Sequence, residues 1–203
     1  MELSVVIPTY NERERLTELV HAITSIFRSV GIRGEVIVVD DNSPDGTGEV
    51  ANQLAQRDDD VKVVHRPGKL GLGSAVMKGF STAQGDVLCV MDADFGHPPA
   101  LLPRMLEAIR KDADFVVASR YIPGGGTRGW PTSRLIMSRM GCHLARPLTP
   151  VRDATSGFFL VKRDVVYNTQ ISAVGFKICL ELLVRGHARA VAELPYVFTN
   201  RLL

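Results

Sequence analysis

The sequence has few cysteines, few aromatic residues and no long apolar run. Its 203 residues include three scattered cysteines without the spacing of a zinc site, namely Cys89, Cys142 and Cys179. This usage fits a reducing compartment and argues against disulfides. No apolar segment approaches the roughly 18 residues of a membrane span, and the N-terminal segment has no signal-peptide pattern. Basic residues are not interleaved with aromatic ones, so nucleic acid is not supported as a partner.

Two widespread nucleotide-binding signatures are incomplete or missing. Gly71 and Gly73 begin like a dinucleotide-binding loop, but Val76 stands in place of its third glycine and no suitable acidic residue follows. The chain also has no Gly-Lys-Ser/Thr phosphate loop. Any nucleotide site must therefore be built from other residues.

What is present is the composition of an ordinary folded protein, with 45% hydrophobic and 23% charged residues. One domain covering residues 1–203 is expected at this length. Residues 1–119 hold 18 acidic and 12 basic residues, a net charge of −6, whereas residues 120–203 hold 4 and 12, a net charge of +8. This division predicts an acidic half that holds a metal ion and a basic half that binds anions or an anionic membrane. Unequal charge on solvated faces is the alternative.

Apolar runs and helical periodicity alternate five times in the first 119 residues. Strands are expected at residues 3–8, 35–39, 61–65, 87–91 and 114–119. Helices are expected at about 16–27, with Asn11 as the N-cap, and at about 47–56, 71–83 and 99–111. This order predicts an α/β domain with a mostly parallel central sheet and helices on both faces.

Polar residues follow four of these strands where each strand ends. They are Tyr10 and Glu12, Asp40 and Asp41, Asp92 and Asp94, and Ser119 and Arg120. In parallel sheets, ligands bind beyond the carboxyl ends of the strands, so these side chains are expected to meet at one site. Asp92 and Asp94 would place two carboxylates within reach of one hard cation that bridges phosphates. A helix-capping aspartate beside a solvated one is the alternative.

After Arg120 the alternation stops. A glycine-rich loop precedes a helix expected at residues 133–146, and later strands are expected at 156–161 and 188–194 around a helix at 177–185. Four apolar residues of the first helix share one arc, with two arginines beside it: Ile136, Met137, Met140 and Leu144, then Arg139 and Arg146. Such an arc suits a membrane interface, and packing against the helix's own domain is the alternative.

Six segments together resemble the family-two glycosyltransferases of GT-A fold, and among these the dolichyl/polyprenyl-phosphate mannose synthases. The segments are Val5-Val-Ile-Pro-Thr-Tyr-Asn-Glu, Val39-Asp-Asp-Asn-Ser-Pro-Asp-Gly-Thr, Lys69-Leu-Gly-Leu-Gly-Ser-Ala, Met91-Asp-Ala-Asp-Phe-Gly-His-Pro-Pro, Ala118-Ser-Arg-Tyr and Asp153-Ala-Thr-Ser-Gly-Phe. The resemblance covers nearly the whole chain and implies a single Rossmann-like catalytic domain. Its nucleotide-binding half would be about residues 1–119, and its acceptor- and lipid-facing half about 120–203.

The resemblance also implies a set of site residues. The nucleoside would be held by Pro8, Tyr10, Glu12, Val39 and Asp41, and the nucleotide and its Mg²⁺ or Mn²⁺ by Asp92, Ala93 and Asp94. Donor and acceptor phosphates would be held by Arg120, Arg134 and Arg201. Asp92, Asp94 and Arg120 would form the catalytic set. His97 is expected to have a structural role rather than a catalytic one.

Two features depart from the family's pattern. Gly96 stands where the family usually has Gln or Ser, so it offers no side-chain oxygen to a metal ion. The family continues after the Arg201 position with a segment that carries a phosphate-contacting lysine, whereas this chain stops at Leu203. A C-terminally truncated chain is therefore expected, with a membrane domain as one possible continuation.

The expected reaction is transfer of mannose from GDP-mannose to a polyprenyl (dolichyl) monophosphate, with inversion to a β-linked product. The alternatives are a UDP-sugar transferase, for example for UDP-glucose, and a catalytically impaired nucleotide-binding remnant. The expected location is the cytoplasmic face of a membrane, as a peripheral protein, because the chain lacks a spanning segment.

Overall fold

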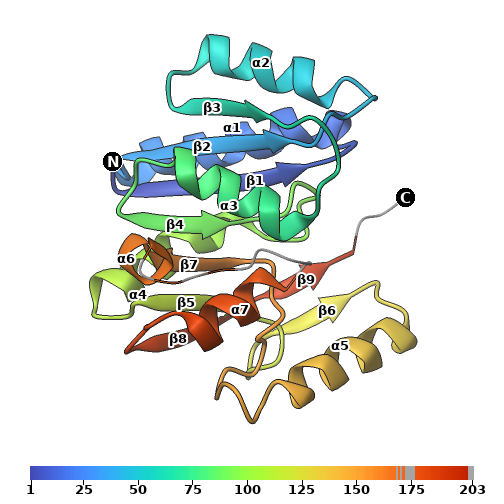
Figure 1. The fold of residues 1–203 in the computed structure, drawn as a ribbon, viewed down its shortest axis with the longest axis vertical. Coiled ribbons are helices and arrows are strands. Elements are labelled where there is room, and N and C mark those ends of the chain that lie inside the picture. Colours follow the sequence, from blue (N-terminus) through green and yellow to red (C-terminus); the bar gives the residue numbers. More distant parts are fainter. Residues whose placement is uncertain (168, 170, 172–176, 201–203) are drawn as a thin grey trace.

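The computed structural model describes residues 1–167, 169, 171 and 177–200 and shows one large sheet with helices on both faces (Figure 1). Seven strands form this sheet in the order β3-β2-β1-β4-β7-β5-β8. They are β1 (Leu3–Thr9), β2 (Gly34–Asp40), β3 (Val61–His65), β4 (Val87–Val90), β5 (Phe115–Ser119), β7 (Phe159–Lys162) and β8 (Val191–Pro195). The first five strands agree with the expected ranges to within a residue at nearly every end.

Helices α1 (Arg13–Val30), α2 (Thr47–Arg57) and α4 (Leu102–Arg110) pack on one face of the sheet, where they share one apolar core. A short 3₁₀ turn, η1 (Pro99–Leu101), leads into α4. Helices α3 (Leu72–Thr82), α6 (Arg163–Tyr167) and α7 (Ile178–Arg185) cover the other face around a second core. Alternate strand residues such as Val5 and Val6 enter opposite cores, as the two-residue period of a strand requires.

Strand β7 is the one antiparallel member among the seven strands. It lies between β4 and β5 and runs opposite to both, with Val90 paired to Phe159 and Val117 also paired to Phe159. The sheet is therefore mixed but mostly parallel, as predicted. Because β4 and β5 run in the same direction, their carboxyl ends still reach the same edge of the sheet.

The start of α1 differs from the expectation. Its N-cap is Glu12, not Asn11. Asn11 instead has a left-handed backbone with a φ of 60°, a conformation that asparagine tolerates better than most residues. Its N–H donates to Ser43 Oγ at 3.1 Å, which ties the end of β1 to the loop after β2.

Two short strands and one helix form a separate region beyond β5. Strand β6 (Gly126–Arg128) pairs in parallel with β9 (Val197–Thr199), which brings distant parts of the chain together. Helix α5 (Thr132–Leu144) lies beyond this pair, at the periphery of the molecule (Figure 1). Among the residues described, no helix is both long and apolar enough to span a membrane.

Candidate active site

The turn after β4 places two carboxylates at the carboxyl edge of the sheet. Asp92 donates its backbone N–H to His97 Nδ1 at 3.0 Å, and Asp94 Oδ1 accepts the N–H of Gly96 at 2.8 Å. Phe95, between Asp94 and Gly96, has a φ of 59°, so the chain reverses sharply here. These local bonds hold both aspartates in one tight turn directly after β4.

The two carboxylates repel each other in a recessed position. Burial and the neighbouring charge of Asp94 raise the pKa of Asp92 to about 7, while Arg120 and Arg134 act in the opposite direction. The Asp92 side chain is still 40% exposed, so the carboxylate remains open to a ligand. A bound cation would favour the ionised carboxylate and so lower this pKa.

His97 supports this turn from inside the protein. Its ring stacks on Phe158 at a centroid distance of 5.2 Å and contacts Tyr196 and Phe198 edge-on. Burial lowers the pKa of His97 to about 3, so the ring is neutral. Because Nδ1 accepts the Asp92 N–H, the proton resides on Nε2, which lies 3.6 Å from Asp92 Oδ2. The structural role expected for His97 is thus to position Asp92.

The donor set fits a hard divalent cation that is shared with phosphate. Asp92 and Asp94 supply carboxylate oxygens, which Mg²⁺ and Mn²⁺ prefer. Within the described part of the chain, no cluster of three or more Asp, Glu, His or Cys side chains forms a fuller site. Two carboxylates with the remaining positions left to substrate phosphate and water is the arrangement typical of Mg²⁺ bound with a nucleotide.

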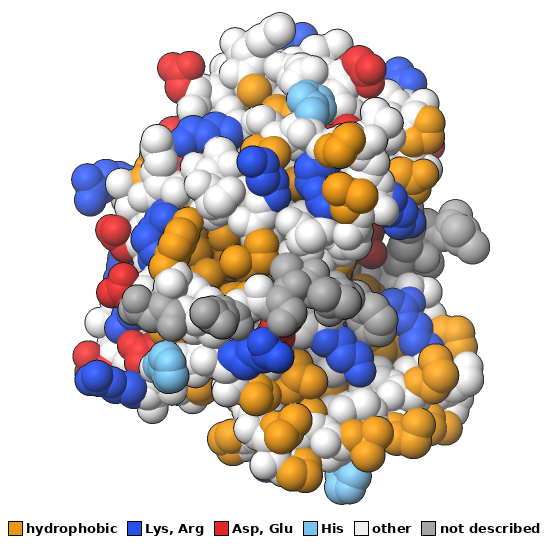
Figure 2. All heavy atoms as spheres, viewed as in Figure 1, with side chains coloured by type: hydrophobic (Ala, Val, Ile, Leu, Met, Phe, Trp, Pro, Cys, Tyr) orange, Lys and Arg blue, Asp and Glu red, His pale blue; other side chains and the backbone are white. Residues whose placement is uncertain are grey.

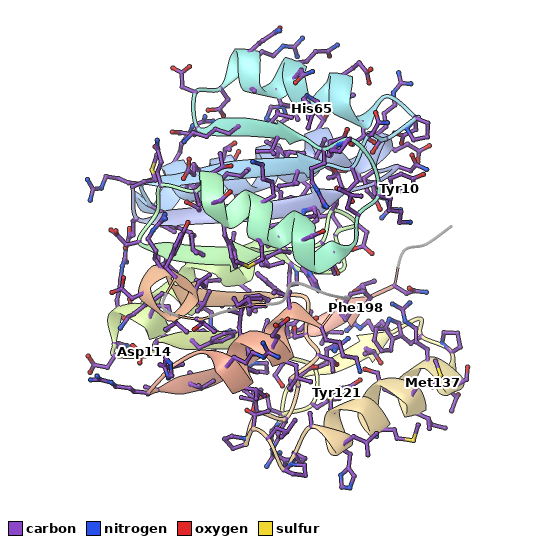
Figure 3. The ribbon with its side chains drawn as sticks, in the orientation of Figure 1. Tyr10, His65, Asp114, Tyr121, Met137 and Phe198 are labelled. Carbon is purple, nitrogen blue, oxygen red and sulfur yellow. The ribbon has the colours of Figure 1, made fainter. Side chains whose placement is uncertain are left out.

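Gly96 is required by its surroundings. A Cβ at this position would lie 2.5 Å from the Phe198 ring and 2.9 Å from Asp94 Oδ1. Phe198 belongs to β9, 102 positions further along the chain, and its ring also packs edge-on against Trp130. The missing side-chain oxygen at position 96 is therefore linked to an aromatic residue that fills the same space. Figure 3 labels this residue, Phe198, on β9.

Arg120 follows β5 and forms a buried ion pair with Asp153. Its Nε and Nη2 each donate to one carboxylate oxygen of Asp153 at 2.7 Å, and its backbone N–H donates to the same group at 2.8 Å. Burial opposes the charge of Arg120, but the Asp153 carboxylate outweighs it and raises the pKa of the guanidinium. The field of Arg120 still reaches Asp92. Asp153 lies in one of the quoted motifs, but its role as the partner of Arg120 was not predicted.

Arg134 lies on α5 and faces the same site. Its guanidinium lies over the Trp130 ring at 4.2 Å, and Nη1 donates to Asn200 Oδ1 at 3.1 Å. A cavity of about 340 Å³ opens here between α5 and the end of β5. Its lining is both basic and apolar, with Arg120, Trp130, Arg134, Met137, Ser138, Gly141, Thr155 and Lys177.

A second cavity of about 130 Å³ gathers several predicted nucleoside contacts. Pro8, Tyr10 and Asp41 line it together with Lys69, whose Nζ lies 4.3 Å above the Tyr10 ring. Asp41 Oδ1 accepts a hydrogen bond from Arg66 at 2.7 Å. Burial raises the pKa of Asp41 despite this cation. Arg66 also donates to Ser74 on α3, a role that sequence reasoning missed although a polar residue directly after β3 is a recognisable signal.

Three other predicted residues, Glu12, Val39 and Ala93, line neither of these two cavities. Val39 is fully buried with its side chain against α3, and its carbonyl accepts the Thr9 hydroxyl. Glu12 caps α1 and donates its N–H to Thr47 Oγ1 at 2.9 Å. Ala93 is buried between the two aspartates. Arg201 lies outside the described residues. An unpredicted contact comes from Arg15 of α1, which donates to the carbonyl of Asp94 at 3.2 Å.

Residues 4–169 match the family model described as glycosyl transferase family 2. The chain belongs to this family. A dolichol-phosphate mannosyltransferase from Pyrococcus furiosus is 42% identical over 99% of this chain, which spans only 57% of that relative's length. A polyprenol monophosphomannose synthase from Mycolicibacterium smegmatis is 41% identical, with 97% of this chain and 77% of that protein covered. A dolichol-phosphate mannosyltransferase from Saccharomyces cerevisiae is 37% identical, covering 99% and 79% respectively.

Solved structures confirm the GT-A fold expected for the family. Glucosyl-3-phosphoglycerate synthase from Mycobacterium tuberculosis, in complex with Mn²⁺, UDP-glucose and phosphoglyceric acid, superposes with a TM-score of 0.73. The match covers 99% of this chain and 72% of that chain at 21% identity. The α/β architecture with a mostly parallel sheet is thus the predicted one.

Metal affinity is expected to depend on pH through Asp92. A cation binds the ionised carboxylate, so below the pKa of about 7 the affinity for Mn²⁺ should fall about tenfold per pH unit, and above it the affinity should level off. Calorimetric titration with Mn²⁺ from about pH 5.5 to 8.5 measures this. The matched variant Asp92→Asn should bind weakly at every pH. A flat profile for the unaltered protein would contradict the assignment.

His97→Phe should weaken Mn²⁺ binding by about 10- to 100-fold, since the Asp92 N–H loses its acceptor and the carboxylate loses its support. Unfolding measurements should show a loss of about 1–3 kcal/mol from the unpaired buried N–H. His97→Asn restores an acceptor near the Nδ1 position, so it should recover part of the metal affinity despite poorer ring packing. Equal metal affinity in both variants would show that the histidine only fills space.

Proposed function

We propose that this chain transfers mannose from GDP-mannose to a polyprenyl (dolichyl) monophosphate, with Mg²⁺ or Mn²⁺ held by Asp92 and Asp94. The observation that carries the reaction class is the meeting of this carboxylate pair with Arg120 and Arg134 at one edge of the sheet. The sugar and the acceptor are taken from the names of the relatives that are 37–42% identical over nearly the full chain.

The divalent ion, when bound, would neutralise the diphosphate leaving group of the donor. The protein's own residues would position the ion and bind the phosphates. Asp92, positioned by His97, and Asp94, positioned by the Gly96 N–H, would hold the ion together with the nucleotide. Arg134 supplies an exposed guanidinium opposite them, a group suited to bidentate phosphate binding.

The acceptor needs no dedicated general base. A lipid monophosphate has a second pKa near 6, so its attacking oxygen is already anionic at neutral pH. The task of the site is to bring two anions together, which the arginines favour electrostatically. Direct displacement inverts the sugar, so an α-linked donor gives a β-linked lipid phosphate.

The cavity of about 340 Å³ fits this acceptor. Arg120, Arg134 and Lys177 form its basic part, and Met137 and Trp130 form its apolar part. A polyprenyl phosphate needs both, because its charged head adjoins a hydrocarbon chain. We therefore propose two functional halves, a nucleotide-binding half at residues 1–119 and an acceptor half at residues 120–203.

The donor base would be recognised around Asp41. Guanine offers two adjacent donors to a carboxylate, whereas uracil offers one. One oxygen of Asp41 is already engaged by Arg66, so a UDP-sugar such as UDP-glucose stays as the second candidate. A third, an impaired nucleotide-binding remnant, is motivated by Gly96.

We further propose that the chain works as a peripheral protein on the cytoplasmic face of a membrane. The apolar arc of α5 faces outward, with Ile136, Met137, Met140 and Leu144 between 57% and 71% exposed. Only Cys142 of this helix is buried. Figure 2 shows hydrophobic side chains gathered over the α5 region, with Lys and Arg side chains next to them. This arrangement favours membrane contact over packing on the domain.

Transfer is tested with a donor panel of GDP-mannose, UDP-glucose and UDP-galactose, with a short-chain polyprenyl phosphate in detergent and Mn²⁺. Mannose transfer giving a β-linked product is expected, and Asp94→Ala should reduce it at least 100-fold because the ion loses a ligand. Arg57→Gln, on the far end of α2, serves as the control and should keep full activity. A product with retained anomeric configuration, or transfer from a UDP-sugar alone, would overturn the proposal.

Met140→Ser with Leu144→Ser should release the protein from vesicles. Each side chain contributes about 1.5–3 kcal/mol when fully buried in an apolar phase, so binding should weaken more than tenfold. Sedimentation with phosphatidylcholine/phosphatidylglycerol vesicles measures the change. Val30→Ser, which removes a 53% exposed apolar side chain at the end of α1, should leave binding unaltered. Unchanged binding in the α5 variant would rule out this face.

A further inference from the structure

A separate cavity of about 260 Å³ opens on the other side of α5. It is lined by Tyr121, Arg139, Cys142, His143, Arg146 and Arg152. It is distinct from the proposed acceptor cavity, whose lining shares none of these residues. The hydroxyl of Tyr121 donates to Ser138 Oγ at 2.7 Å, and this bond connects the walls of the two cavities.

The three arginines of this cavity have no carboxylate partner among the described residues. Arg146 Nη1 donates to the Pro150 carbonyl at 2.6 Å, and Arg139 lies 5.6 Å from the Tyr121 ring centre. The one carboxylate that touches Arg152 is Glu193, and it accepts backbone N–H groups, from Arg152 at 2.9 Å and from Asp153 at 3.2 Å. Three guanidinium groups thus line one cavity without an ion pair in the described part of the chain.

The surrounding segment of the sequence also has an excess of positive charge. Residues 121–152 contain five arginines, no lysine and no acidic residue. Like charges around one cavity repel each other, and an anion bound between them relieves the repulsion. The guanidinium fork matches a phosphate group in shape and stays charged at any physiological pH. The cavity is therefore suited to a phosphate.

The neighbouring surface indicates which kind of molecule would carry that phosphate. Met140 and Leu144 directly follow the lining residues Arg139 and His143 and are 57% and 71% exposed, and Leu148 nearby is 61% exposed. A soluble phosphate makes no use of exposed apolar side chains. A phospholipid does, because its acyl chains begin close to its phosphate.

We propose that this cavity binds the phosphate headgroup of an anionic membrane phospholipid, a lipid other than the acceptor. The arginines would hold the headgroup while Met140, Leu144 and Leu148 enter the adjoining apolar layer. This inference rests on the membrane contact proposed above and adds a lipid class and a defined site to it.

The test compares two triple variants with the same change in charge. Arg139, Arg146 and Arg152→Gln removes the cavity's cations, whereas Arg33, Arg57 and Arg104→Gln removes three exposed arginines from other parts of the molecule. Binding is measured by sedimentation with phosphatidylcholine vesicles containing 30% phosphatidylglycerol, and with phosphatidylcholine alone. Each arginine at an anionic surface is worth about fivefold in affinity, so the cavity variant should lose on the order of 100-fold and the control much less.

Equal losses in the two variants would overturn the proposal, because net charge alone would then explain binding. Inorganic phosphate is titrated calorimetrically without vesicles. Tight binding that depends on the cavity, with equal vesicle binding in both variants, would assign the cavity to a soluble phosphate. Cavity-dependent binding of polyglutamate with no vesicle binding would assign it to an acidic protein. Both results would reject the lipid site.

Transfer by the unaltered protein to a short-chain polyprenyl phosphate in detergent is measured alongside. An absence of transfer there would count against the proposed reaction only. The vesicle comparison would still decide the headgroup site, so the two failures are distinguishable.

Discussion

The buried pair of Arg120 and Asp153 joins the parts of the molecule on which the site depends. Asp153 is fully buried and takes three hydrogen bonds from Arg120, at the end of β5. Its own N–H donates to Glu193 of β8, and Cys142 of α5 lies 3.7 Å from its carboxylate. Removing one member of such a pair leaves an uncompensated buried charge, which typically costs about 3–5 kcal/mol. The pair therefore couples the integrity of the sheet edge to the position of α5.

The same edge carries an opposing electrostatic constraint. Burial and the neighbouring charge of Asp94 raise the pKa of Asp92 to about 7, while Arg120 and Arg134 act in the opposite direction. The division of charge along the sequence thus corresponds to a division in space, with acidic groups from the first half facing basic groups from the second. A cation and a diphosphate together complement both sides, whereas either one alone leaves one sign of charge unbalanced.

Much of the fold follows from short-range patterns that are visible in the sequence. The five strand–helix alternations predict the sheet, and the polar residues that follow its strands predict that Asp41, Asp92 and Arg120 lie at its carboxyl edge. The position of β7 could not be predicted, because its Phe-Leu-Val run is equally compatible with any buried place in a sheet. The orientation of the Val39 side chain could not be predicted either. A motif identifies a position in the chain but not the face of the sheet toward which its side chain points.

Long-range packing accounts for the other surprises. From the sequence, Gly96 is interpreted only as the absence of a metal-ligating side chain. The structure adds a packing reason, because β9 places Phe198, 102 positions away, in the space that a side chain at position 96 would occupy. Asn11 is a residue type that often caps helices, but here its backbone is left-handed and its N–H donates to Ser43. In both cases the residue type was informative, and the partner that gives it a role lay on a distant segment.

Helix α5 shows how a weakly packed element can still have a defined orientation. Its apolar arc faces away from the domain, so burial of that arc does not hold the helix in place. Polar contacts hold it instead, from Arg134 to Asn200, from Tyr121 to Ser138 and from Cys142 to Thr155. These contacts join the helix to the turn after β5, to the segment after β9 and to the loop that carries Asp153. A membrane that meets the exposed arc would consequently lie in a fixed orientation to Asp92, with a basic cavity on each side of the helix.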